Sequence, residues 1–160
     1  MNHIISVLVE NKAGVLAKIS GLFSRRGFNI ESLAVGPTED DKISRVTMEV
    51  EAEEHSIEQI IKQLYKLINV IKIQELDPSN IVERQLVLIK VNADSKTRPE
   101  VLEIVDVFRA NIVDVAKKTL MIEITGKSRK VKALEDLLRP FGIIELVRTG
   151  KIACTRGSKY

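Results

Sequence analysis

The stretch HIISVLVENKAGVLAKISGLFSRRGFNI, residues 3–30, combines two apolar periodicities on either side of a short polar segment. Residues 3–10 have the pattern of a strand, whereas the apolar residues after the polar segment recur at the spacing of one helix face. The residues on that face are Val15, Leu16, Ile19, Leu22 and Phe23. Gly27 follows two arginines, as is typical of a helix C-terminus. A second strand is predicted from Asn29 to about Val35, so the stretch predicts a strand, a helix and a strand.

Two more strands and a second helix are predicted before residue 77. Pro37 and the acidic run 39–41 indicate a loop. In the third strand, residues 46–51, the apolar side chains should face the core and the alternate side chains should face solvent. The second helix has five apolar residues on one face: Ile57, Ile60, Ile61, Leu64 and Ile68. Val70–Leu76 is the fourth predicted strand, and the resulting order is βαββαβ.

The segment Asp77–Asn80 breaks this pattern and is the best candidate for a linker. The same order then repeats, with strands near 86–91, 112–115, 120–124 and 143–147. One helix has Pro99 in its first turn, and Val131, Leu134, Leu137 and Leu138 indicate the other. We therefore predict an α+β fold of two ferredoxin-like βαββαβ modules in tandem. The first domain should comprise residues 1–77 and the second should comprise residues 78–160.

A module of this type covers one face of its sheet with two helices and leaves the other face open. Small modules bury too little apolar surface to be very stable alone. Burial of the open face or of a sheet edge against a second copy would add to that core. The topology therefore predicts a homodimer.

The composition is that of a globular chain, with 44% hydrophobic and 29% charged residues. No apolar run approaches the roughly 18 residues of a membrane span, and the N-terminus lacks a signal-peptide pattern. The single cysteine, Cys154, rules out an internal disulfide and fits a reducing compartment. We expect a cytoplasmic protein without a membrane partner.

Charge differs between the two halves of the chain: the net charge is −3 over residues 1–77 and +6 over residues 78–160. A basic half can indicate nucleic-acid binding. The only basic cluster, however, is Lys127, Arg129, Lys130 and Lys132. RNA-binding modules of the same topology stack bases on aromatic residues of their central strands, and the predicted third strand has none. We expect no nucleic-acid partner.

The residue types that carry catalysis are isolated along the chain. The two histidines, His3 and His55, are far apart, and no Cys/His/Asp set has metal-ligand spacing. The pair Glu53-Glu54 begins the second predicted helix, where negative charge offsets the helix dipole. No glycine-rich phosphate loop is present. We therefore expect a non-catalytic chain with no cofactor of its own.

The junction ENKAGVL, residues 10–16, is the candidate binding site. A strand leads here into a helix N-terminus, whose first N–H groups lack intrahelical partners and can hold a carboxylate. Gly14 allows a ligand to approach closely, and the amide of Asn11 can both donate and accept. This combination suits the α-carboxylate and α-ammonium of a free amino acid. The local residues leave an alternative open, in which Asn11 caps the helix and Gly14 merely opens it.

The segment SVLVENKAGVLAKISGLFSRRGFNIESLAVGPTED, residues 6–40, resembles the small regulatory subunits of acetohydroxyacid synthase, also called acetolactate synthase. The first module resembles an ACT domain, a small-molecule-binding regulatory module. Gly27–Leu33 is the specific part of the match. The resemblance continues through Val82–Arg84 and includes Arg148–Gly150 and Thr155–Gly157 near the end of the chain.

The resemblance implies a regulatory subunit of branched-chain amino acid biosynthesis. Such a subunit activates a separate catalytic subunit and makes it sensitive to feedback inhibition by valine or a related branched-chain amino acid. Thiamine diphosphate, FAD and magnesium would belong to the catalytic subunit. The implied ligand site lies between two ACT modules, with Asn11, Gly14 and Val15 from one chain and Asn29 and Ile30 from the other.

The resemblance does not extend the ligand site to the second module. Its equivalent loop, residues 92–99, is longer and has no glycine at the helix start. We therefore expect this module to contribute to assembly or signalling. A free-standing ACT sensor that acts on a different enzyme is the alternative function.

Overall fold

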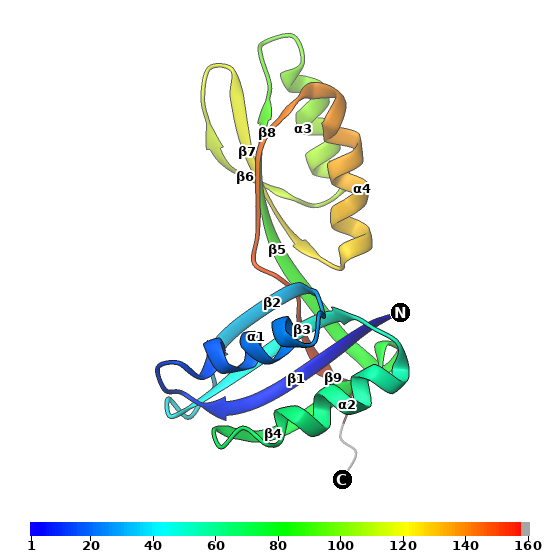
Figure 1. The fold of residues 1–160 in the computed structure, drawn as a ribbon. Helices are drawn as coiled ribbons and strands as arrows, with labels where there is room; N and C mark the ends of the chain where they lie inside the picture. The colour runs from blue at the N-terminus through cyan, green and yellow to red at the C-terminus, as the bar shows by residue number, and fades with distance from the viewer. Residues whose placement is uncertain (158–160) are drawn as a thin grey trace. The chain divides into compact units, whose positions relative to one another are not determined.

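The computed structural model describes residues 1–157, which form two compact units. The first unit comprises Met1–Val82 together with the described residues from Lys151 onward, and the second comprises Glu83–Gly150. Each unit contains an antiparallel sheet with two α-helices (Figure 1). None of the described helices is long and apolar enough to cross a membrane.

The first unit has the four-stranded sheet that the sequence predicts, in the order β2-β3-β1-β4. Its elements are β1 (Asn2–Glu10), α1 (Val15–Arg25), β2 (Ile30–Pro37), β3 (Ile43–Glu51), α2 (Glu54–Leu64), β4 (Val70–Leu76) and the 3-10 turn η1 (Pro78–Asn80). Alternate residues of β1, such as Ile5 and Val7, are fully buried in a core shared with Ile19 and Phe23 of α1 and Ile57 of α2. Both helices therefore pack on one face of the sheet.

The second unit repeats this connectivity, with the strand order β6-β7-β5-β8. Its elements are β5 (Ile81–Asn92), which starts in the first unit, α3 (Arg98–Val107), β6 (Asn111–Val115), β7 (Thr119–Gly126), α4 (Ser128–Leu138), η2 (Arg139–Phe141) and β8 (Ile143–Arg148). Val101 of α3 and Leu134 of α4 pack with Ile89 and Ile122 of the sheet in a separate core. The predicted α+β fold of two ferredoxin-like modules is confirmed.

The end of the chain differs from the prediction, because residues after Gly150 belong to the first unit. They form a ninth strand, β9 (Ile152–Thr155), which pairs with β5. The N–H of Lys151 donates to Ser32 Oγ at 2.7 Å, and the N–H of Arg156 donates to the Asn80 carbonyl oxygen at 2.9 Å. The predicted second domain, 78–160, is therefore wrong at its C-terminal end, where these bonds hold the chain on the first unit.

This returning segment lies on the face of the first sheet that the two helices leave uncovered. Ser32 and Ile4 both pair with Glu49, and Ile4 pairs with Leu76, so these residues form one row across the four strands. Lys151 contacts Ser32 and Glu49 in that row, and Ala153 packs on the cluster that contains Ile4. The prediction that this face stays open is therefore wrong for the first unit.

Smaller differences concern individual side chains. Thr47 was expected to face solvent but is buried, since it lies on the face that carries the returning segment. Ile68 was expected on the apolar face of the second helix, but α2 ends at Leu64 and Ile68 is 87% exposed. Pro37, expected in a loop, is the last residue of β2.

Candidate functional site

The loop between β1 and α1 is short because the strand ends at Glu10 and the helix begins at Val15. Gly14 stands between them in a left-handed conformation, with φ 84° and ψ −9°. A side chain is disfavoured at such φ values, which explains a glycine here. A Cβ atom at this position would have no neighbour within 4 Å, so the restriction comes from the backbone alone. The helix start therefore faces open space.

Asn11 ties this loop to the hairpin between β2 and β3. Its backbone N–H donates to the carbonyl oxygen of Lys42 at 2.8 Å, and its side-chain Nδ2 donates to the carbonyl oxygen of Asp41 at 2.8 Å. No side chain caps α1. The alternative in which Asn11 caps the helix is therefore wrong, and the first N–H groups of α1 have no side-chain acceptor among the described residues.

A cavity of about 590 Å³ lies beside Asn11, between the end of β1 and the β2–β3 hairpin. Its lining residues are Glu10, Asn11, Lys12, Asp40, Asp41, Lys42 and Ile43. The ammonium of Lys12 lies 2.7 Å from the carboxylate of Glu10 and, by donating a hydrogen bond to it, lowers the pKa of Glu10. The cavity thus presents both signs of charge.

The structure brings together only part of the implied ligand set in one chain. Ile30 pairs with Val50, whereas Glu10 pairs with Ile43. These positions are seven residues apart along β3, or about 23 Å at strand spacing. Asn29 and Ile30 therefore lie at the opposite end of the sheet from Asn11.

The remaining implied residues have local roles. The side chain of Asn29 is exposed and donates from Nδ2 to Glu31 Oε1. Ile30 is half-buried against the core. Val15 is buried, with 5% exposure, and its backbone N–H donates to the carbonyl oxygen of Lys12 at 3.5 Å. Asn11 and Gly14 are therefore the implied residues that lie exposed in the β1–α1 loop.

Sequence reasoning missed the contribution of the hairpin residues Asp40, Asp41 and Lys42 to this cavity. The sequence pattern indicates only that Asp40 and Asp41 belong to a loop. The hairpin residues could have been predicted from the antiparallel pairing of the first and third strands. This pairing places the end of the first strand beside the start of the third. The loop before the third strand must then lie beside the ENKAG segment.

The corresponding loop of the second unit is built differently. The N–H of Ala93 donates to the carbonyl oxygen of Lys118 at 2.8 Å, which matches the Asn11–Lys42 bond of the first unit. The side chain of Arg98 then donates to the carbonyl oxygens of Ala93, Ala116 and Lys117. The guanidinium of Arg98 thus closes this loop onto the β6–β7 hairpin, where the first unit has the Asn11 amide.

No group of three or more His, Cys, Asp or Glu residues able to hold a metal ion occurs within residues 1–157. The buried His3 is accounted for by its neighbours, since Nδ1 lies 2.6 Å from Glu75 Oε1 and Nε2 lies 3.1 Å from the carbonyl oxygen of Ala52.

Comparisons with known proteins agree with this architecture. A family model described as an AHAS small subunit-like ACT domain matches residues 5–72, and a model described as the small subunit of acetolactate synthase matches residues 84–157. A probable acetolactate synthase small subunit of Archaeoglobus fulgidus is 55% identical over 159 residues, which are 99% of each chain. The chain belongs to the acetolactate synthase small-subunit family.

Other members of the acetolactate synthase small-subunit family match along nearly their whole length. The small subunit of Mycolicibacterium smegmatis is 54% identical over 157 residues, which cover 98% of this chain and 92% of that protein. The crystal structure of the small subunit from Thermotoga maritima has a TM-score of 0.93 at 43% identity and 99% coverage of both chains. The predicted ACT domain in the first module is confirmed.

Proposed function

We propose that this small subunit activates the catalytic subunit of acetolactate synthase and confers feedback inhibition by valine on branched-chain amino acid synthesis. The observation that carries the proposal is the uncapped start of α1 beside the Asn11 amide and a cavity of mixed charge. The chain itself would bind no cofactor, and thiamine diphosphate, FAD and magnesium would belong to the catalytic subunit. We expect the complex in the cytoplasm.

The geometry supports an α-amino acid as the ligand. Its carboxylate would accept hydrogen bonds from the first N–H groups of α1, where the helix dipole also favours negative charge. Since Nδ2 of Asn11 is already bonded to Asp41, the ligand ammonium would face Asn11 Oδ1. The acidic hairpin residues on the cavity wall favour the same orientation.

The second half of the site would come from a second copy of the chain. β2 is an edge strand of the first sheet. Antiparallel pairing of two β2 strands about their middle sets Ile30 of one chain opposite Pro37 of the other. Pro37 pairs with Ser44, beside the Asn11 end of the sheet. A two-fold dimer through β2 would therefore bring Asn29 and Ile30 of one chain to the Asn11 loop of its partner.

A ligand held between two chains can transmit a signal by linkage. Valine would favour the dimer geometry in which both halves of its site are closed. The catalytic subunit would be activated by a different geometry, and the ratio of valine affinities for the two geometries sets the coupling. No chemical step in this chain is needed.

Reconstitution tests the proposal directly. The purified chain is added to catalytic subunit, and acetolactate formation is measured as valine, leucine or isoleucine is titrated. We expect activation by the chain, a fall in activity with valine, and no turnover by the chain alone. Absence of activation, or a response to valine that is the same with and without the chain, would contradict the proposal. The three side chains differ by about one methylene, which is worth only about 1–3 kcal/mol, so the titration itself must rank valine, leucine and isoleucine as effectors.

A further inference from the structure

The second unit contains a cavity of about 510 Å³ that the proposed valine site does not involve. It lies where β7 leads into α4 and is lined by Arg84, Thr125, Gly126, Lys127, Arg129, Lys130 and Ala133. Four of these seven residues are cationic. Gly126 is buried, and a Cβ atom there would lie 2.9 Å from Cδ of Lys130, so the aliphatic stem of this lysine packs on the cavity wall. We call the four cations the basic cavity cluster.

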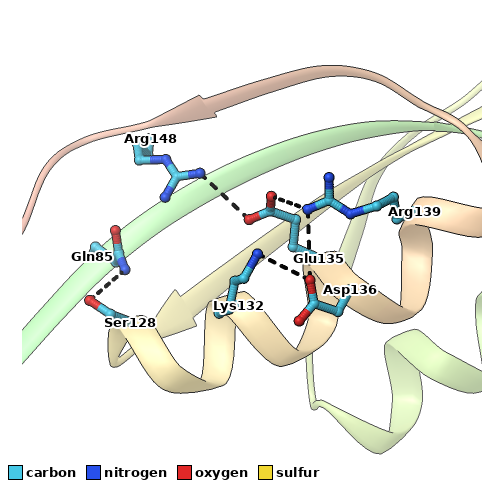
Figure 2. A network of polar contacts seen from close by, with 7 residues as sticks. All are labelled: Gln85, Ser128, Lys132, Glu135, Asp136, Arg139 and Arg148. Carbon is cyan, nitrogen blue, oxygen red and sulfur yellow. Dashed lines mark hydrogen bonds and ion pairs between the residues drawn. The ribbon is translucent and has the colours of Figure 1, made fainter.

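The other charged side chains of α4 form ion pairs with neighbouring residues. Lys132 pairs with Asp136 at 3.1 Å, Arg139 pairs with Glu135 at 3.0 Å, and Arg148 of β8 lies 3.6 Å from the same glutamate (Figure 2). Every acidic residue of the helix is thereby engaged. Ser128, at the start of the helix, accepts a hydrogen bond from Gln85 and brings no charge (Figure 2).

The basic cavity cluster has no such compensation. Within residues 1–157, none of Arg84, Lys127, Arg129 and Lys130 forms an ion pair with a carboxylate. Arg84 donates instead to the backbone oxygen of Glu83, and Lys130 donates to that of Thr125. Four like charges around one concavity repel one another, and opposite charge from outside the chain would relieve this repulsion.

We propose that the basic cavity cluster receives an acidic segment of the catalytic subunit. This inference rests on the proposed function, since it takes the catalytic subunit as the partner. The carboxylates of that segment would pair with Lys127, Arg129 and Arg84 at the rim, and the aliphatic stem of Lys130 would contact its carbon atoms. Complementary charges of this kind guide association and fix the register of two surfaces.

The lining does not favour nucleic acid as the occupant. None of the seven lining residues is aromatic, so the cavity has no platform on which a base could stack. The cations also surround one concavity, whereas single-stranded nucleic acid usually follows a charged groove that combines cations with stacking aromatic side chains. A compact acidic peptide segment matches this concavity better.

The test compares two double variants in the full-length chain. K127E/R129E reverses two charges of the cluster, and K117E/K118E reverses two exposed charges in the β6–β7 turn as the matched control. A glutamate near the start of α4 suits the helix dipole, so the first variant should fold, as circular dichroism and thermal melting will show. Valine binding, which the proposed function places in the first unit, should be unchanged in both variants.

Affinity for the catalytic subunit is then measured at two salt concentrations. We expect K127E/R129E to bind about tenfold or more weakly and to lose much of the salt dependence, while K117E/K118E stays within about threefold of the unaltered chain. Equal affinities of the two variants would overturn the inference. Failure of the unaltered chain to bind the catalytic subunit at all would instead overturn the proposed function.

Carbodiimide coupling, which joins lysine amines directly to carboxylates, identifies the contact. We expect Lys127 or Lys130 to be joined to an Asp or Glu of the catalytic subunit, with the product lost at high salt. Links from these lysines to residues of this chain alone would overturn the inference. So would binding of inorganic phosphate or a single-stranded RNA that depends on the cluster, together with unchanged affinity of K127E/R129E for the catalytic subunit.

Discussion

Asn11 donates a hydrogen bond from Nδ2 to the backbone oxygen of Asp41, at 2.8 Å, across the mouth of a cavity that both residues line. This bond orients the amide so that Oδ1 faces away from the hairpin. The Asn11–Asp41 pair thus links the conformation of the β2–β3 hairpin to the group expected to meet the ligand ammonium.

Replacement of Asn11 by alanine should weaken valine binding about 10- to 100-fold, because hydrogen bonds to charged groups are worth about 1.5–3 kcal/mol. The residue is exposed, so the loss of its bond to Asp41 should lower the melting temperature only slightly. Calorimetric titration and thermal melting of the same variant separate the two effects. A clear loss of stability with unchanged affinity would show that Asn11 is purely structural.

Three substitutions at Gly14 separate backbone strain from charge. Alanine, asparagine and aspartate each place a side chain on a backbone with φ 84°. This conformation lowers the stability of the fold by about 1–2 kcal/mol, and the penalty is smallest for asparagine and aspartate. Gly14→Asp alone adds a negative charge where we place the ligand carboxylate. We expect it to abolish the valine response and to preserve activation of the catalytic subunit.

Gly14→Asn is the matched control for Gly14→Asp, since it has the same shape and no charge. It should retain a measurable valine response, so the difference between the two isolates electrostatic repulsion. The assay is inhibition of the reconstituted complex by valine, with thermal melting to confirm folding. Equal valine responses for the two variants would show that the ligand carboxylate does not bind at the start of α1.

Mixing two defective chains tests whether the site is shared between protomers. The register of the first sheet sets Asn29 about 23 Å from the Asn11 end of the same chain. Homodimers of Asn11→Ala or of Asn29→Ala should have both sites impaired. A heterodimer of the two variants should contain one intact site and one doubly altered site, so mixing should restore valine binding to about half of the dimers.

Titration of the mixed sample after subunit exchange measures this restoration directly. The Asn11→Ala homodimer mixed with the unaltered chain serves as the control for exchange. If all five residues served one site within a chain, each chain of the heterodimer would remain defective and mixing would restore nothing.

Arg98 should matter for stability rather than for valine. Its guanidinium donates to three backbone oxygens that join the loop after β5 to the β6–β7 hairpin. Arg98→Ala should destabilise the second unit by about 1.5–3 kcal/mol, and Arg98→Lys should recover little, because an ammonium cannot reproduce the planar fork. Hydrogen exchange should show the loss of protection near Ala93 and Lys118.

Lys96→Ala is the control for Arg98→Ala, since it removes an exposed cation of the same loop without these side-chain bonds. It should leave the free energy of unfolding nearly unchanged. If both substitutions lowered the free energy of unfolding equally, the loss would come from the removed positive charge and not from the three Arg98 hydrogen bonds. Reduced valine affinity in Arg98→Ala, with normal stability, would contradict the structural role.

The alternation of periods two and 3.6 was sufficient to predict both modules and their topology. The prediction succeeded because the apolar residues of the local pattern are the residues buried in the folded chain. Val46, for example, is buried, whereas its neighbour Arg45 is exposed. The loop that holds Asn11 and Gly14 could be predicted from the sequence, since a helix start is a local feature, and the ligand site there stays a prediction. The hairpin side of the cavity, at Asp41, depends on strand pairing between distant segments.

The returning strand shows what periodicity cannot reveal. Ile152–Thr155 is short, and its side chains, Ala153 apart, are exposed, so nothing in the local pattern marks it as part of a sheet. Its place depends on individual polar bonds to Ser32 and Asn80, residues more than 70 positions earlier. Thr47, on the same face of the sheet, is buried as well, which the third-strand pattern does not reveal.

The ion pair between Lys151 and Glu49 provides a test of that contact. The two charged groups are 3.1 Å apart, and their side chains are only 11% and 16% exposed. Lys151→Met leaves a largely buried carboxylate without this ammonium, which costs more than the 0–1 kcal/mol of a surface pair. We expect a loss of about 2 kcal/mol in the free energy of unfolding, measured by urea denaturation.

The double variant Lys151→Met/Glu49→Gln should be more stable than the sum of the two single losses predicts, because the unpaired carboxylate is then absent. Lys66→Met, which removes an exposed lysine of the same unit, is the control and should change stability by less than about 0.5 kcal/mol. Truncation after Gly150 should destabilise the first unit further, since it also removes Ala153 from the cluster around Ile4. If the truncated chain unfolds at the same urea concentration as the full chain, the returning strand does not contribute to the first unit, and the domain would end at Val82.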